Sequence, residues 1–309
     1  MKVLIVYSGK VIDGIEIFPW QVEKFIVALS TMSSRRKFIQ NSAAAFAGAI
    51  ALPNASFSAA TKSAANTPLN FGMAGYTFAK LDIPTSIAIM KRVDIKYISI
   101  KDIHLPVNST PEKIQSVVAQ FKDAGINVYT VGVIYMKTQE AVDAAFAYAK
   151  LVGVPMIVGV PNPELLDYTE AKIKATDIKL AIHNHGPEDK LYPSPKDVME
   201  QIKNRDKRMG LCMDIGHATR AGADPAKVAV EYKDRLFDLH IKDVTGAVKD
   251  AKVIEVGRGI IDFPALIKAL NKIKYQGICS LEYEKDMTDP LAGIAESAGY
   301  FRAVVKTIG

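Results

Sequence analysis

The chain has 309 residues, of which 49% are hydrophobic and 23% are charged. This is a globular composition with enough chain to bury a large core, and the length fits either two ordinary domains or one barrel. The formal net charge is +6, but residues 1–65 hold seven of the 39 Lys and Arg and three of the 33 Asp and Glu, which leaves +2 for the remainder. Because this body is nearly neutral, we predict no nucleic-acid partner.

Residues 32–65 have the pattern of an export signal. Arg35 and Arg36 precede an apolar stretch from Ala43 to Leu52, and small residues follow it. This order resembles a twin-arginine export signal, which implies a periplasmic or exported protein; if the segment is an ordinary amphipathic helix instead, the protein is cytoplasmic. The apolar stretch is too short and too rich in Ala and Gly for a membrane span, so we predict no stable membrane anchor.

The position of this pattern also bears on where the working chain starts. Met32 stands directly before it, whereas export signals normally lie at the extreme N-terminus. Met32 is therefore a candidate start, and residues 1–31 would be an upstream extension of uncertain status. The expected organisation is an upstream extension over 1–31, a signal and linker over 32–65, and one folded domain over 66–309.

From Asn70 onward, short β-rich runs alternate with amphipathic segments. Such alternation indicates parallel strands joined by helices, and eight units in roughly 240 residues match a TIM barrel. We therefore predict a single α/β domain, a (β/α)8 TIM barrel. The predicted strands are Asn70–Phe78, Lys96–His104, Asn127–Tyr135, Pro155–Val160, Lys179–His185, Met209–Ile215, Leu236–Val244 and Gly277–Glu284. The predicted helices include Pro111–Ala124, Thr138–Leu151, Pro195–Asn204, Pro225–Lys233, Pro264–Lys272 and Pro290–Val305.

A doubly wound open sheet is the alternative fold. It would usually show a glycine-rich phosphate turn after its first strand, and Gly72-Met73-Ala74-Gly75 does not match GxGxxG. The weakest unit of the predicted barrel is the fourth, because Glu164–Asp177 is short and polar. Cys212 shares the parity of Asp214 on its strand, whereas Cys279 has the parity opposite to that of Glu282 on its strand. One cysteine would face inward and the other outward, so we predict buried thiols without a mutual disulfide.

Ionisable residues gather at the ends of the last four predicted strands, where barrel enzymes carry their active sites. Side chains alternate between the two faces of a strand, and these ionisable residues share the inward parity. Buried charges are costly unless they are paired or bind a metal, so four strands in phase favour a common site over unrelated salt bridges. The residues are His183, His185, Asp214, His240, Lys242, Glu282 and Glu284.

Histidines and carboxylates in one site suit a divalent cation. Mixed nitrogen and oxygen ligands are compatible with Mn2+, Mg2+, Co2+ or Zn2+ and do not choose among them. The sequence therefore predicts one divalent metal ion at the mouth of the barrel.

Four motifs on consecutive strands resemble the xylose isomerase-like sugar isomerase/epimerase superfamily. They are Asp-x-x-His at Asp214–His217, His-x-Lys at His240–Lys242, Val-Gly-Arg-Gly-Ile-Ile-Asp at Val256–Asp262 and Leu-Glu-Tyr-Glu at Leu281–Glu284. The resemblance extends from about Asn70 to Lys306. It implies a metal held by Glu, Asp, His and Glu from strands five to eight. Asp214, His240 and Glu282 match the last three positions, whereas His183 stands where a glutamate is expected.

The resemblance also implies a reaction. Superfamily enzymes remove the proton next to a sugar carbonyl and form an enediolate that the metal stabilises. We therefore expect a metal-dependent sugar isomerase or epimerase with a small sugar or glycoside as its partner. The expected metal ligands are His183, Asp214, His240 and Glu282. The expected catalytic residues are His183, Glu282, His217 and Lys242, and the expected substrate-binding residues are His104, His185, His217, Lys242 and Arg258.

Three alternatives stay open at this point. The histidine at position 183 breaks the symmetry of a two-glutamate epimerase and leaves room for a lyase that performs β-elimination on 3-keto-glycosides. An endonuclease of the apurinic type shares the barrel and Asp-x-x-His, but uses three metals, more histidines and a basic groove. A sugar-binding barrel without catalysis is the third. The sequence leaves the sugar, the metal and the oligomeric state open.

Overall fold

The computed structural model describes residues 5–7, 10–12 and 69–308 of the chain. The chain divides into two units, residues 1–62 and 63–309. In the first unit, β1 (Ile5–Tyr7) pairs antiparallel with β2 (Lys10–Ile12). The predicted export signal and linker over 32–65 lie outside the described residues, as does most of the upstream extension.

The second unit contains a closed barrel of eight parallel strands, which confirms the predicted (β/α)8 fold. The strands follow their order in the chain, and the last one, β12, closes the barrel against β3 and β9. All eight predicted strands are present. They are β3 (Asn70–Ala74), β4 (Tyr97–Ile100), β5 (Asn127–Met136), β6 (Met156–Pro161), β7 (Lys179–His183), β8 (Met209–Asp214), β9 (Leu236–Ile241) and β12 (Ile278–Leu281).

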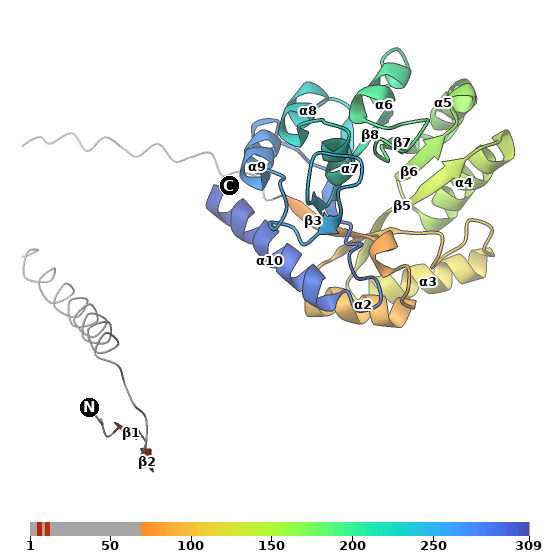
Figure 1. Ribbon diagram of the computed structural model, residues 1–309. Helices are drawn as coiled ribbons and strands as arrows, with labels where there is room; N and C mark the ends of the chain where they lie inside the picture. Colours follow the sequence, from red (N-terminus) through yellow and green to blue (C-terminus); the bar gives the residue numbers. More distant parts are fainter. Residues whose placement is uncertain (1–4, 8–9, 13–68, 309) are drawn as a thin grey trace, which may run out of the picture. The chain divides into compact units, whose positions relative to one another are not determined.

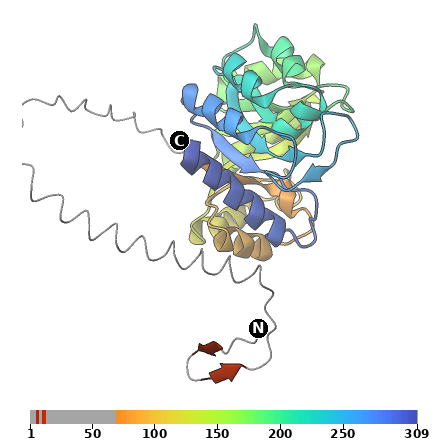
Figure 2. The ribbon, with the colours of Figure 1, turned by 60° about the vertical axis from the view of Figure 1, so that its left-hand side comes forward.

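Helices surround the barrel, as Figures 1 and 2 show. Six of them match predicted segments: α3 (Pro111–Asp123), α4 (Gln139–Val152), α6 (Pro195–Ile202), α8 (Pro225–Glu231), α9 (Phe263–Lys272) and α10 (Leu291–Ile308). Three more follow β3, β6 and β8: α2 (Ile83–Arg92), α5 (Leu166–Thr176) and α7 (Ile215–Arg220). Short 3-10 turns, η2 (Gly75–Phe78) and η3 (Pro163–Leu165), follow β3 and β6, and β10 (Asp243–Val244) pairs with β11 (Val253–Ile254).

Local sequence determines where these helices begin and end. Ser194 caps α6: its side chain accepts a hydrogen bond from the backbone N–H of Asp197, whose carboxylate accepts one from the N–H of Ser194. This reciprocal pair satisfies two N–H groups that the helix itself leaves free, and Pro195 occupies the first turn. Gly153 ends α4 in the left-handed conformation with φ 82°, which glycine adopts without strain.

The strand parity predicted from sequence holds in the barrel. Ile182, Met213 and Leu239 are fully buried and belong to the apolar core. Three polar side chains also lie in the barrel interior below the mouth. The hydroxyl of Tyr129 donates a hydrogen bond to Asp238 and contacts the hydroxyl of Ser280. Burial raises the pKa of Asp238 to about 7. Both cysteines are buried free thiols, as predicted.

Among the helices that the structure describes, none is both long and apolar enough to cross a bilayer.

Two glycines at positive φ allow the packing of the barrel to be tested. The φ angles are 142° at Gly132 and 74° at Gly125. A Cβ at Gly132 would overlap the carbonyl oxygen of Val158, whereas one at Gly125 would meet no atom within 4 Å. We expect Gly125→Ala to lower the free energy of unfolding by about 1–2 kcal/mol through backbone strain. Gly132→Ala should add a steric cost of about 1–3 kcal/mol to this, measured by urea unfolding. Equal costs for the two variants would contradict the close approach of β5 and β6.

Candidate metal centre

A cavity of about 260 Å³ lies at the C-terminal end of the barrel. A larger cavity of about 470 Å³ is lined by residues from the N-terminal ends of the strands, such as Lys179 and Ile278. Because TIM-barrel enzymes place their chemistry at the C-terminal face, we take the smaller cavity as the candidate site. Its lining residues are Tyr76, Lys101, Val133, Tyr135, His183, His185, His217, Glu282 and Glu284.

Four potential metal ligands converge at this cavity. One donor atom from each of His183, Asp214, His240 and Glu282 lies within 4.8 Å of the others, and all four side chains are buried. His183 Nε2 is 3.1 Å from His240 Nδ1 and 3.8 Å from Asp214 Oδ2. His240 Nδ1 is 3.3 Å from Glu282 Oε2. Donor atoms bound about 2.1 Å from a single ion stand roughly 3–3.5 Å apart, so the spacing fits one divalent cation.

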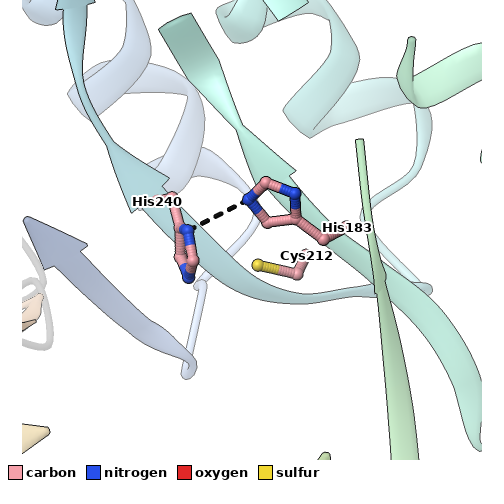
Figure 3. Close-up of side chains that lie close together, drawn as sticks. All are labelled: His183, Cys212 and His240. Atoms are coloured by element: carbon pink, nitrogen blue, oxygen red, sulfur yellow. Dashed lines mark hydrogen bonds between the residues drawn. The ribbon is translucent and has the colours of Figure 1, made fainter. Parts of the chain in front are cut away.

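The hydrogen bonding of these residues leaves one buried oxygen open to a cation. Among the described residues, Asp214 Oδ2 accepts no hydrogen bond and has an ion pair with Lys242, whereas the unpartnered ring nitrogens, His183 Nδ1 and His240 Nε2, are the ones that do not face the other donors. Buried polar atoms normally have a partner, and each exception requires an explanation. Figure 3 shows the two imidazole rings facing each other, with the sulfur of Cys212 directed toward His240. The residues therefore fit a divalent cation.

Lys242 brings a buried cation into contact with the acidic ligands. Its ammonium lies 3.0 Å from Asp214 Oδ2 and 3.0 Å from Glu282 Oε2, and it also pairs with Glu284. The Lys242 side chain is only 1% exposed. Burial opposes the charge of His240, but Cys212 and Glu282 raise its pKa well above the usual value, so its imidazole adds a second positive charge. Two cations facing three carboxylates leave one negative charge, and a bound metal would replace the proton of His240.

Burial and neighbouring charges set the protonation of the site. Burial, followed by the neighbouring His185 and His240, holds the pKa of His183 well below its usual value, so its imidazole is neutral at pH 7. Burial opposes the charge of Glu282, but Lys242 and His240 lower its pKa well below the usual range. Neutral imidazole and ionised carboxylate are the forms that bind metals.

His217 is held in one orientation by Arg220. The guanidinium of Arg220 donates to His217 Nδ1 at 3.1 Å and to Glu188 at 2.8 Å, which ties α7 to the loop after β7. Because Nδ1 accepts this hydrogen bond, the proton of the neutral ring is on Nε2, which lies 4.0 Å from Asp214 Oδ2. Burial lowers the pKa of His217 to about 4, so the ring is a neutral donor at pH 7.

The structure brings most of the predicted site residues together, but not all of them. His183, His185, His217 and Glu282 line the cavity, and Asp214, His240 and Lys242 contact these residues from below. His104 is directed elsewhere: its Nε2 lies 3.0 Å from the carbonyl oxygens of Phe78 and Leu81.

Arg258 also does not line the cavity. Its guanidinium pairs with Glu296 of α10, and its side chain is 56% exposed. The carboxylate of Asp243 accepts hydrogen bonds from the backbone N–H groups of Gly257, Gly259 and Ile261 and so organises the loop that carries Arg258. The motif is therefore structural here, and the structure does not bring Arg258 to the site.

Several cavity residues were not identified from the sequence. Lys101 follows β4, and its ammonium donates to the carbonyl oxygen of Val133. Tyr135 of β5 donates to, or accepts from, His185 Nε2 at 2.9 Å and stacks on its ring. Tyr76 lies in η2. Lys101 lies within the predicted strand Lys96–His104, so a basic residue near the C-terminal end of that strand was the available signal, whereas Tyr135 lies in an apolar run without a motif.

Residues 86–304 match the protein family described as xylose isomerase-like TIM barrel, which is more than half of the chain. The chain belongs to this family. The resemblance inferred from the four motifs is therefore confirmed.

Individual relatives of this family member match over shorter segments. The rhizopine catabolism protein MocC from Rhizobium meliloti is 30% identical over 124 residues, which are 35% of this chain and 38% of that protein. An inosose dehydratase from Lacticaseibacillus casei is 29% identical over 94 residues, 26% of this chain and 32% of that protein. The matches thus span about a third of the length of these curated relatives. The crystal structure of an uncharacterized protein from Parabacteroides distasonis is 27% identical, with a TM-score of 0.59 over 76% of this chain and 98% of that one.

The charge balance around Lys242 leads to a stability prediction. Lys242→Met leaves three buried or half-buried carboxylates without their cation, so the free energy of unfolding of metal-free protein should fall by about 3–5 kcal/mol. Added Zn2+ should recover more of this stability than it adds to the wild type. The measurement is urea unfolding in EDTA and in Zn2+.

Lys196→Met is the control, because Lys196 pairs with Glu200 and the two side chains are 75% and 57% exposed. Its loss should be about 1 kcal/mol or less and independent of metal. Similar losses for the two variants would show that Lys242 does not balance a buried charge cluster.

Proposed function

We propose that the protein is a divalent-metal-dependent enzyme that removes the proton next to the carbonyl group of a sugar, acting as a sugar isomerase or epimerase. One observation carries the proposal: two imidazoles and two carboxylates converge beside a cavity, in a cluster whose carboxylates outnumber its cations. Membership of the xylose isomerase-like family supports it. The cavity of about 260 Å³ suits a small sugar.

His183, Asp214, His240 and Glu282 would hold the metal. When bound, a divalent ion polarises the sugar carbonyl and stabilises the enediolate that forms as the α-proton leaves. His183 contributes through Nε2, the nitrogen that faces His240 and Asp214. An imidazole that binds through Nε2 would keep its proton on Nδ1, which in His183 is buried.

Glu282 is the residue placed to take the α-proton. Its side chain lines the cavity and is ionised, and Oε2 is held by His240 and Lys242. Oε1 is thus the oxygen left for the substrate proton. His217 presents a neutral Nε2–H to the same region and suits a hydroxyl or developing oxyanion of the sugar.

A second candidate function is β-elimination. An epimerase needs two comparable acid–base groups on opposite faces of one carbon, whereas here a carboxylate and an imidazole occupy the two positions. A base paired with a neutral N–H donor suits the departure of a β-substituent, as in a lyase acting on 3-keto-glycosides. The similarity to an inosose dehydratase favours this chemistry over a symmetric epimerisation.

Two further candidates receive less support. Endonuclease activity would need several metals and a basic groove, whereas the cavity is lined by Glu282 and Glu284 and holds one cluster of ligands with Asp214. A sugar-binding barrel without catalysis would bind its ligand and never exchange a carbon-bound proton. Turnover separates it from both enzymatic candidates.

The metal is tested first. Wild-type protein should bind one divalent ion, and the Asp214→Ala/His240→Ala variant should bind none, because two of four converging ligands are gone. Elemental analysis after equilibrium dialysis gives the stoichiometry, and circular dichroism verifies the fold of the variant. Retention of one ion by the folded double variant would refute the site.

His183 is tested through proton exchange into substrate. His183→Gln keeps a similar volume but removes the ligand nitrogen, so both metal binding and exchange should fall by about a hundredfold or more. His183→Glu restores the ligand of the superfamily and should retain metal and exchange. The measurement is NMR of keto-sugars in D2O. If His183→Gln leaves metal affinity and exchange intact, the histidine is structural.

The products in the same assay separate the two enzymatic candidates. An isomerase or epimerase incorporates deuterium next to the carbonyl and keeps every substituent of the sugar. A lyase acting on a 3-keto-glycoside releases the group from the β-carbon and leaves an unsaturated ketone. Deuterium incorporation without release of the β-substituent supports an isomerase or epimerase. Release of the β-substituent at the same rate as proton exchange supports a lyase.

A further inference from the structure

The donor set of this centre differs from the superfamily pattern at one ligand. A glutamate is expected at position 183, and this chain has a histidine whose Nε2 lies among the other donors, 3.1 Å from His240 Nδ1 and 3.8 Å from Asp214 Oδ2. The set therefore offers two imidazole nitrogens and two carboxylates. The expected set offers one imidazole nitrogen and three carboxylates.

The exchanged ligand changes the chemistry of the site. Imidazole suits Zn2+ and other late transition metals, whereas carboxylates suit Mg2+ and Mn2+. The substitution also removes one negative charge, and Lys242 further weakens both remaining carboxylates from 3.0 Å. Hard ions depend most on ligand charge, so they lose the most from these two features.

Cys212 adds a soft donor below the same site. Its sulfur and one nitrogen each from His183 and His240 lie within 4.8 Å of one another, and all three residues are buried. Cys212 pairs in register with His183 across β7 and β8, two residues before Asp214 on β8. Figure 3 shows its sulfur beside the two imidazoles. A thiophilic ion can thus reach sulfur without leaving the two imidazoles.

We propose that His183 makes this a zinc-class centre, which discriminates for Zn2+ and Co2+ against Mn2+ and Mg2+ more strongly than a glutamate at that position would, and that Cys212 is within reach of a thiophilic ion. The proposal rests on the metal-dependent function proposed above and names the class of ion. Any ligand set favours Zn2+ over Mn2+ to some degree, so the quantity that matters is the change in selectivity caused by His183.

The experiment compares the ratio of the Mn2+ and Zn2+ dissociation constants in three full-length proteins by competition dialysis and elemental analysis. We expect this ratio to be at least about tenfold larger in the wild type than in His183→Glu. His185→Glu is the matched control, because His185 lines the same cavity but is not one of the four donors. It adds the same charge and should leave the ratio within about twofold of the wild type.

The outcomes separate this proposal from the proposed function. An unchanged ratio in His183→Glu, or an equal shift in His185→Glu, overturns the role of His183 even if sugar turnover is found. A shifted ratio without turnover supports the metal class and refutes the catalytic function. If none of the three proteins binds an ion, both proposals fail.

Cd2+ tests the reach of Cys212 separately. When Cd2+ is added to metal-free protein, the thiol should lose its proton to solvent and form a Cd–S bond, which gives thiolate-to-metal absorption in the ultraviolet. Cys212→Ser should lose this absorption, whereas Cys279→Ser should retain it, since Cys279 is buried outside the donor group. Absorption that is absent in the wild type, or that persists in Cys212→Ser, overturns the role of Cys212.

Discussion

The mouth of the barrel depends on one constraint, the balance of charge around a buried ammonium. Lys242 contacts the carboxylates of Asp214, Glu282 and Glu284 in a region with almost no exposure to solvent. Taking ions out of water costs several kcal/mol for each one, and only close pairing recovers that cost. The ammonium and the protonated imidazole of His240 offset two of these three carboxylates, and one negative charge is left for a cation to balance.

The barrel can hold this cluster because neighbouring strands fix the positions of its donors. Asp214 on β8 pairs with His240 on β9, whereas His183 on β7 pairs with Cys212, two residues before Asp214. Glu282 follows β12, two residues beyond Ser280, which pairs with His240. Asp214 is fixed twice. Its Oδ1 accepts from the backbone N–H of His217 as the N-cap of α7, and its own backbone exchanges hydrogen bonds with Asn184. Oδ2 is then the oxygen directed to the site.

Local signals in the sequence predict most of the strands and helices of the barrel. Eight strands and six helices were found because Pro, Gly and capping residues mark their boundaries and apolar residues follow their periods. α5 was judged weak because Glu164–Asp177 is polar, yet Leu166, Thr169 and Ile173 bury one face of it. The predicted strand Met209–Ile215 includes the first residue of α7, because Asp214 ends β8 and caps α7 at the same time.

The direction of a site side chain was predictable where alternation along a strand determines it. It was not predictable where contacts with distant elements determine it. Parity correctly placed His183, His240 and Glu282 inward. Arg258 was expected near substrate from its motif, but its direction is set by Glu296 on a distant helix. Tyr135 reaches His185 only because β5 and β7 stand on either side of β6 in the barrel, and no local pattern reveals this.

The protonation of the site bears on which reaction the barrel favours. Glu282 has a pKa held well below the usual range, so it accepts a proton reluctantly and, once protonated, returns it readily. His183 is neutral and, as a ligand, offers only a donor from Nδ1. Epimerisation requires a second group that delivers a proton to the opposite face of the carbon, and neither residue is tuned for that task. Loss of a β-substituent needs no such delivery, because the electrons of the enediolate expel the leaving group while a donor such as His217 stabilises it. Under the proposed function, a histidine in place of one glutamate would therefore favour elimination, the second candidate, over epimerisation.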